Sequence, residues 1–238
     1  MSRLKLSESI NMRTKPLLLF ATLLLTAGYS SGSLTLGHAA ESLRSTAPVQ
    51  IDGWAAIKTD AGLLLVWNGR GLNFTLAIKG TEVKSLNESE NPIFDVDGKV
   101  LQIQVVEIES FAPGAREKKL DDRAILAAHR DWEAKYLENL FKSKLTVQAF
   151  NLKLSNGSDA SILQFDMPES MDADAKKQVY LTIVSKDQVL LLNSVATAAT
   201  SDSEARKFLT DTIATLKLSP TPIDEKKLAE SIRQGTAP

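Results

Sequence analysis

The chain has 238 residues, of which 43% are hydrophobic and 24% are charged, and its formal net charge at pH 7 is −1. This composition is typical of a globular protein and excludes a disordered chain, a collagen and a multi-span membrane protein. Because the sequence has no cysteine, disulfides, thiolate zinc sites, iron–sulfur clusters and a cysteine nucleophile are excluded as well.

Residues 1–40 have the pattern of a secretory signal peptide. Four basic residues precede an apolar run from Pro16 to Gly28, and small residues follow as far as Ala40. The run is shorter than the ~20 residues that a membrane-spanning helix needs. We therefore predict cleavage near Ala40, a periplasmic or extracellular location, and no stable membrane span after cleavage. An uncleaved signal anchor is the alternative, and Met12 is as plausible a start as Met1.

The remainder of the chain is mildly acidic. The leader contains four of the 28 basic residues and one of the 29 acidic residues, so the rest carries a net charge of −4 with both signs interspersed. This balance disfavours a nucleic-acid partner. Residues 41–50 are polar and predict a flexible start. Residues 51–219 are predicted to form a single domain.

Pairs of apolar segments joined by turn residues predict antiparallel hairpins. Asn-Gly and Asp-Gly steps are the strongest short-range signal of such turns. The predicted strand pairs are 62–67 with 72–78, 93–94 with 100–108, 146–154 with 161–167, and 179–184 with 189–197. The last of these strands is apolar on both faces, which predicts a central strand that is covered on both sides.

Two amphipathic helices are predicted. In the first, residues 121–142, apolar side chains recur at three- and four-residue steps and form one stripe. Its members are Ile125, Ala128, His129, Trp132, Tyr136 and Leu140. The second helix opens at Ser201 and Glu204, which are spaced as a capping box, and ends before Pro220. The tail, residues 220–238, is expected to be weakly helical or disordered.

The order of these elements predicts an α+β fold. Strands that follow one another through tight turns pair antiparallel, because a parallel pair needs a long crossover. We therefore expect an antiparallel sheet of about six to eight strands, packed by the two amphipathic helices.

Two segments resemble PsbP-like domains. Residues 62–78 (GLLLVWNGRGLNFTLAI) are similar to the opening hairpin of that family, and residues 178–218 are similar to its closing hairpin, polar loop and final helix. Residues 80–120 do not match the family. The resemblance implies a PsbP-like sandwich and an exported, largely non-enzymatic domain that attaches to larger assemblies. It brings no catalytic residue onto this sequence.

One constellation is a candidate ligand-binding site. His129 and Glu133 are spaced i, i+4 on the long helix, and Trp132 lies between them in the sequence. One imidazole and one carboxylate are fewer than the three or four ligands that zinc takes, so no metal is predicted. Packing of His129 and Trp132 in the core is the alternative. No catalytic residue and no cofactor are predicted.

These observations predict an exported, non-catalytic domain that binds a protein partner or a small ligand in the cell envelope. Two alternatives stay open. One is a periplasmic or secreted hydrolase that uses carboxylates together with His129. The other is a small-molecule carrier with a pocket between the long helix and the sheet.

Overall fold

A computed structural model describes residues 49–51, 53–69, 71–86, 91–155, 157–168 and 174–236. The predicted leader and residues 41–48 of the predicted flexible start lie outside the described residues. The chain divides into two units, residues 1–33 and 34–238, and every described residue belongs to the second.

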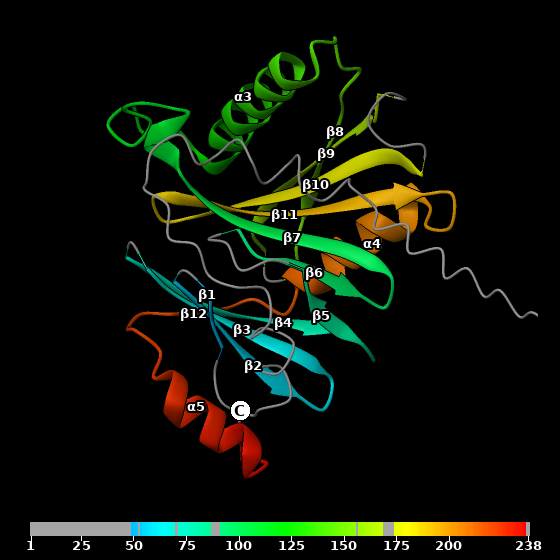
Figure 1. The fold of residues 1–238 in the computed structure, drawn as a ribbon. Coiled ribbons are helices and arrows are strands. Elements are labelled where there is room, and N and C mark those ends of the chain that lie inside the picture. Colours follow the sequence, from blue (N-terminus) through cyan, green and yellow to red (C-terminus); the bar gives the residue numbers. More distant parts are fainter. Residues whose placement is uncertain are drawn as a thin grey trace, which may run out of the picture. The chain divides into compact units, whose positions relative to one another are not determined.

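The described strands form two antiparallel sheets (Figure 1). The five-stranded sheet has the order β1–β2–β3–β4–β12, with β1 Val49–Ile51, β2 Trp54–Thr59, β3 Gly62–Gly69, β4 Leu72–Lys79 and β12 Lys217–Ser219. The seven-stranded sheet has the order β5–β6–β7–β11–β10–β9–β8, with β5 Val83–Ser85, β6 Ile93–Val96, β7 Lys99–Glu107, β8 Gln148–Lys153, β9 Asp159–Asp166, β10 Ala175–Ser185 and β11 Gln188–Thr197. Neighbouring strands in the sequence are mostly joined by tight turns, as the turn signals predicted.

The described helices cover these sheets. They are the 3-10 helix η1 (Ile108–Ser110) and the α-helices α3 (Asp122–Phe141), α4 (Asp202–Ile213) and α5 (Glu225–Arg233). The predicted capping box is present at the start of α4, where Ser201 and Glu204 exchange side-chain and backbone hydrogen bonds. Helices α3 and α4 pack on opposite faces of the seven-stranded sheet, and α5 packs on the outer face of the five-stranded sheet.

The main hydrophobic core lies between the two sheets and is closed on one side by α4. Successive side chains of a strand point to opposite faces of the sheet, so Leu190 and Leu192 of β11 both point into this core. Trp54, Trp67 and Phe74 form its aromatic part, with the Trp54 and Trp67 ring centroids 4.7 Å apart. The sandwich is therefore held mainly by apolar burial between its layers.

The α+β class with antiparallel strands is confirmed, and the central position of the last long strand, β11, is confirmed as well. The seven-stranded sheet, with α3 and α4 on its two faces, matches the predicted sheet packed by two helices. The other strands form a second sheet. In this sheet Ala55, Ile57 and Val66 point outward toward α5, while their neighbours face the shared core.

The structure contains a short strand and a helix at the two ends of the predicted domain. Strand β1 begins at Val49, within the segment predicted to be flexible. The tail, for which a weak helix or disorder was expected, contains helix α5, whose Ala229 is buried against the five-stranded sheet. The Asn68 side chain anchors the approach to α5, since it donates to the Ile223 carbonyl and accepts from the Ile223 amide, both at 2.8 Å.

We predict that Gly69→Ala destabilises the fold by about 1–3 kcal/mol, because the new methyl group would overpack the core. A Cβ atom at Gly69 would lie 2.8 Å from Cζ2 of Trp67, whose ring is confined by Trp54. Urea unfolding measures the change. The control is Gly71→Asn in the same turn, where φ is +75° and nothing lies within 4 Å of the new Cβ. Equal losses in both variants would contradict the packing argument.

Candidate functional site

Helix α3 lies across the face of the seven-stranded sheet that points away from the sandwich core (Figure 1). Its N-cap, Asp121, accepts a hydrogen bond of 2.8 Å from the Ala124 amide, which satisfies one of the free N–H groups of the first turn. Its C-cap, Lys142, adopts the left-handed conformation. The described chain then turns back and enters β8, so α3 is tied to the edge of the sheet that it covers.

The side chains that α3 presents to the sheet include a carboxyl group. Leu126, Glu133 and Leu137 follow one another at helical spacing on the sheet-facing side, opposite Tyr180 and other residues of β9, β10 and β11. Most of the predicted stripe packs as expected: Ile125 and His129 are buried, and Tyr136 and Leu140 pack in the clusters under α3. Glu133, which was not part of the stripe, lines the cavity against the sheet.

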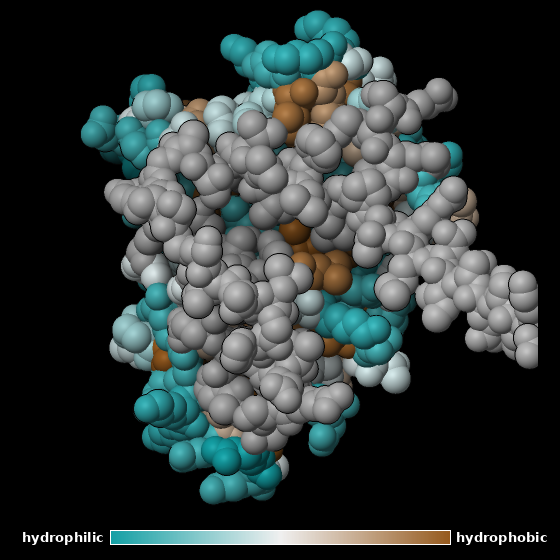
Figure 2. Space-filling model, viewed as in Figure 1, coloured by the Kyte–Doolittle hydropathy of each residue, from teal (hydrophilic) through white to brown (hydrophobic). Residues whose placement is uncertain are grey.

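Apolar side chains also gather at the far end of this interface. Figure 2 shows hydrophobic side chains beside the end of α3, next to a hydrophilic outer surface. The partly buried members of the cluster under α3 are Tyr136, Leu140, Phe141, Leu145, Val147 and Met167. The C-terminal half of α3 is thus attached through a continuous apolar contact, whereas the middle of the helix carries ionisable groups.

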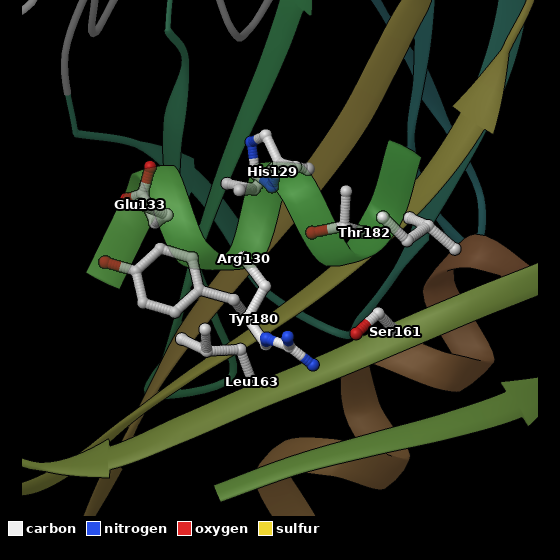
Figure 3. Close-up of a pocket in the computed structure, with 9 residues that line it drawn as sticks. His129, Arg130, Glu133, Ser161, Leu163, Tyr180 and Thr182 are labelled. Atoms are coloured by element: carbon white, nitrogen blue, oxygen red, sulfur yellow. The ribbon is translucent and has the colours of Figure 1, made fainter. Parts of the chain in front are cut away.

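A small cavity opens between the middle of α3 and the sheet (Figure 3). It is lined by Leu126, His129, Arg130, Glu133, Ser161, Leu163, Tyr180, Thr182 and Leu191. The volume open to the centres of water molecules is about 10 Å³. The cavity therefore holds about one water molecule. The cavity combines apolar walls with several hydroxyl and ionisable groups.

Glu133 is the unusual member of this set. Among the described residues no hydrogen bond or ion pair to its carboxyl group is present, and burial raises the pKa of Glu133 to about 7. Burial also raises the pKa of Tyr180, and the nearby Glu133 charge raises it further. Tyr136 is affected in the same way. The carboxyl group is therefore neutral through most of the acidic range.

His129 is the second buried ionisable group. It is 2% exposed, and burial lowers its pKa to about 4. Its ring packs edge-on against Phe111 at a centroid distance of 4.9 Å. The Nε2 atom is buried without a hydrogen-bond partner among the described residues. Between pH 4 and pH 7 the histidine is thus neutral while Glu133 retains its proton.

The structure brings two of the three predicted site residues together. His129 and Glu133 line the cavity, whereas Trp132 does not; it belongs to an aromatic row with Phe111, His129 and Tyr136, and its ring is stacked with Tyr136. His129 packs both in the core and against the cavity, so the two interpretations of this residue overlap.

Sequence reasoning missed the part of the cavity that the sheet supplies. Ser161 pairs with Thr182, and Leu163 pairs with Tyr180, across β9 and β10. The alternation of side chains in these strands indicates which residues share a face. It does not indicate which face α3 covers, and that choice is what places Tyr180 opposite Glu133.

The described residues contain neither a metal-binding cluster nor a helix that could cross a membrane. No group of three or more histidine, aspartate or glutamate side chains in this part of the chain is arranged to hold a metal ion. In the same residues, no helix has both the length and the apolar character that crossing a membrane requires.

Comparison with models of protein families found no match, and comparison with curated proteins found none either. Among solved structures, the chain is similar to the solution structure of cyanobacterial PsbP (CyanoP) from Synechocystis sp. PCC 6803. The sequences are 9% identical, the alignment covers 80% of this chain and 98% of that chain, and the TM-score is 0.40.

We predict that Glu133→Leu stabilises the protein at pH 8 by about 1–3 kcal/mol, because a leucine replaces a carboxylate that loses its hydration without gaining a partner. Glu138→Leu on the same helix is the matched comparison. Its carboxylate accepts from the Leu145 amide at 3.1 Å and lies 3.4 Å from the Lys144 ammonium, so its loss should destabilise the protein. Urea unfolding of both variants tests the contrast, and destabilisation by Glu133→Leu would contradict it.

Proposed function

We propose that this protein is an exported, non-catalytic binding domain of the cell envelope that takes up an extended, acidic segment of a partner protein along strand β8. The observation that carries the proposal is the open edge that β8 presents, with an exposed aromatic side chain and basic flanks.

Strand β8 is the last strand in the order of the seven-stranded sheet. Within the described residues it has β9 as its one strand partner. An edge strand presents a row of backbone N–H and C=O groups that another extended chain can pair with. Addition of a strand to such an edge is a common way in which proteins bind extended peptides.

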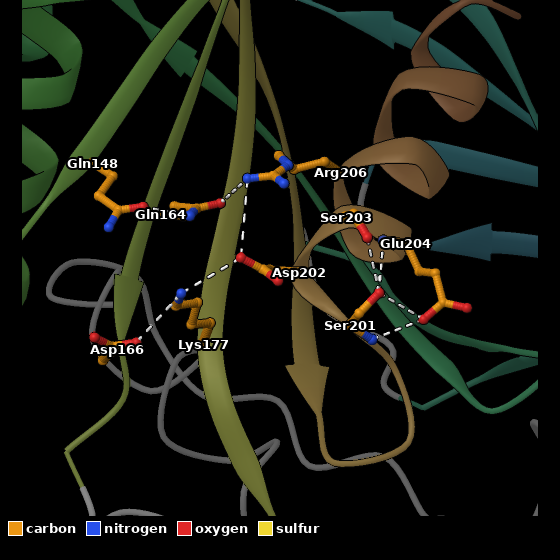
Figure 4. A network of polar contacts seen from close by, with 9 residues as sticks. All are labelled: Gln148, Gln164, Asp166, Lys177, Ser201, Asp202, Ser203, Glu204 and Arg206. Carbon is orange, nitrogen blue, oxygen red and sulfur yellow. Dashed lines mark hydrogen bonds and ion pairs between the residues drawn. The ribbon is translucent and has the colours of Figure 1, made fainter.

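The side chains of β8 are arranged for contact on the face that α4 approaches. Phe150 is 43% exposed, and the guanidinium carbon of Arg206 lies 5.5 Å from the centre of its ring. Arg206 donates at 2.9 Å to Gln164, which donates at 2.7 Å to Gln148 (Figure 4). Helix α4 and β9 therefore hold the cation beside the aromatic ring before any partner arrives.

The charges around β8 indicate the chemistry of the partner. From residue 139 to residue 158 the charged residues are Lys142, Lys144 and Lys153, with no acidic residue. The nearest carboxylates, Glu138 and Asp159, are partly exposed and already paired with lysines of this segment. An acidic segment complements this edge. The same lysines oppose pairing with a second copy of the strand.

The cavity under α3 is too small to hold a small-molecule ligand. Pockets for small molecules occupy about 300–1,000 Å³, whereas the cavity at His129 and Glu133 has room for about one water molecule. The carrier alternative would require that α3 move away from the sheet, and the hydrolase alternative would require a substrate to reach His129 by the same route.

The export part of the proposal rests on the sequence pattern of residues 1–40. We expect that the protein purified from an exporting bacterial host begins near Glu41, and intact-mass measurement tests this. A full-length chain that stays in the membrane fraction would contradict cleavage and favour the signal-anchor alternative.

Strand addition at β8 is tested with two synthetic eight-residue peptides, one alternating threonine and glutamate and the other alternating threonine and lysine. We expect the acidic peptide to shift the amide NMR resonances of residues 148–153, and the basic peptide to leave them unchanged. Phe150→Ala combined with Lys144→Glu and Lys153→Glu should weaken binding of the acidic peptide by about tenfold or more.

The matched control is Leu218→Ala. Leu218 is 58% exposed on β12, the edge of the five-stranded sheet, so its loss removes an exposed apolar side chain elsewhere. This variant should bind the acidic peptide as the unaltered protein does. Resonance shifts outside the β8 edge, equal binding of both peptides, or no binding of either would contradict the proposal.

A further inference from the structure

The interface between α3 and the seven-stranded sheet contains two ionisable groups one helical turn apart, His129, which is buried, and Glu133, which is partly buried. His129 and Glu133 both line the cavity under α3, and neither forms an ion pair within the described residues (Figure 3). Leu126 and Leu137 flank them along the helix and are buried. An acid and a base thus lie in the same apolar interface, and neither of them stabilises that interface when it is charged.

The charged and titratable groups that face this pair are few. On α3 itself they are Arg130, whose guanidinium is paired with Asp131 at 2.8 Å, and Tyr136. From β10 the facing group is the Tyr180 hydroxyl. The other lining residues, from β9, β10 and β11, carry hydroxyl or apolar side chains, and the loop after η1 contributes Phe111. Among the described lining residues the cation is Arg130, and its charge is already paired with Asp131.

Burial acts on the two residues in opposite directions. It favours the neutral histidine, which has one proton fewer than its charged form, and the neutral glutamic acid, which has one proton more. For His129, with a folded pKa of about 4 against 6.5, the stability contribution rises as pH increases from 4 to 6.5. For Glu133, with a folded pKa of about 7 against 4.5, it falls as pH increases from 4.5 to 7.

We propose that His129 and Glu133 form a compensating pair that keeps the docking of α3 on the sheet nearly constant between mildly acidic and neutral pH. When α3 separates from the sheet, His129 takes up a proton and Glu133 releases one, so the two changes offset each other.

The variants that remove one member of the pair expose the contribution of the other. Glu133→Gln should lower the stability at pH 5 relative to that at pH 7. The ratio of the folding equilibrium constant at pH 7 to that at pH 5 should become about 40-fold larger than in the unaltered protein. His129→Gln should make the same ratio about 20-fold smaller than in the unaltered protein. The double variant should return close to the pH dependence of the unaltered chain.

The experiment is urea unfolding of the full chain and each variant at pH 5 and pH 7. Glu230→Gln, the same exchange at an exposed position of α5, is the control and should leave the pH dependence unchanged. Single variants that shift the pH dependence in the same direction, or not at all, would overturn the proposal.

A second measurement does not depend on the stability of the variants. The imidazole NMR resonances of His129 are followed with pH in the unaltered protein, with His38→Gln to assign the two histidines. We expect no protonation of His129 above pH 5. Protonation near pH 6.5 would overturn the pairing, whatever the variants show.

Discussion

Burial of both faces of β11 is the constraint on which the rest of the structure depends. Leu190 and Leu192 point into the core between the sheets, while Val189 and Leu191 point toward the layer that contains α3. A strand of this kind is stable only when apolar partners cover it from both sides. The second sheet with α4 supplies one cover, and α3 with the loop after η1 supplies the other.

The two layers that cover β11 differ in polarity. The core between the sheets is almost entirely apolar, whereas the interface under α3 places a carboxyl group and an imidazole opposite Tyr180. Such an interface gains apolar burial only as long as both groups stay neutral. The proposed function and the proposed compensation concern the same part of the molecule, since α3 leads directly into the β8 edge.

Much of the fold could be predicted from local signals, and the misses have physical causes. Turn residues located the hairpins because Asn-Gly and Asp-Gly steps depend on backbone conformation alone. Strand β5 was missed because its three residues lie in a polar segment and pair only with β6. On α3 the apolar stripe was placed correctly at Ile125, His129, Tyr136 and Leu140, but the pattern did not show that Trp132 packs against Phe111 or that Glu133 lines the cavity against the sheet.

The sequence by itself determined the absence of cysteine chemistry, the predicted leader, the hairpins, the two long helices and the two-sided burial of β11, because composition and short-range periodicity carry that information. Only the tertiary structure decided that the strands split into two sheets, that Tyr180 lies under Glu133, and that Phe150 with Arg206 marks an open edge. Each of these depends on contacts between residues distant in the chain, and no local pattern specifies which faces of two elements will meet.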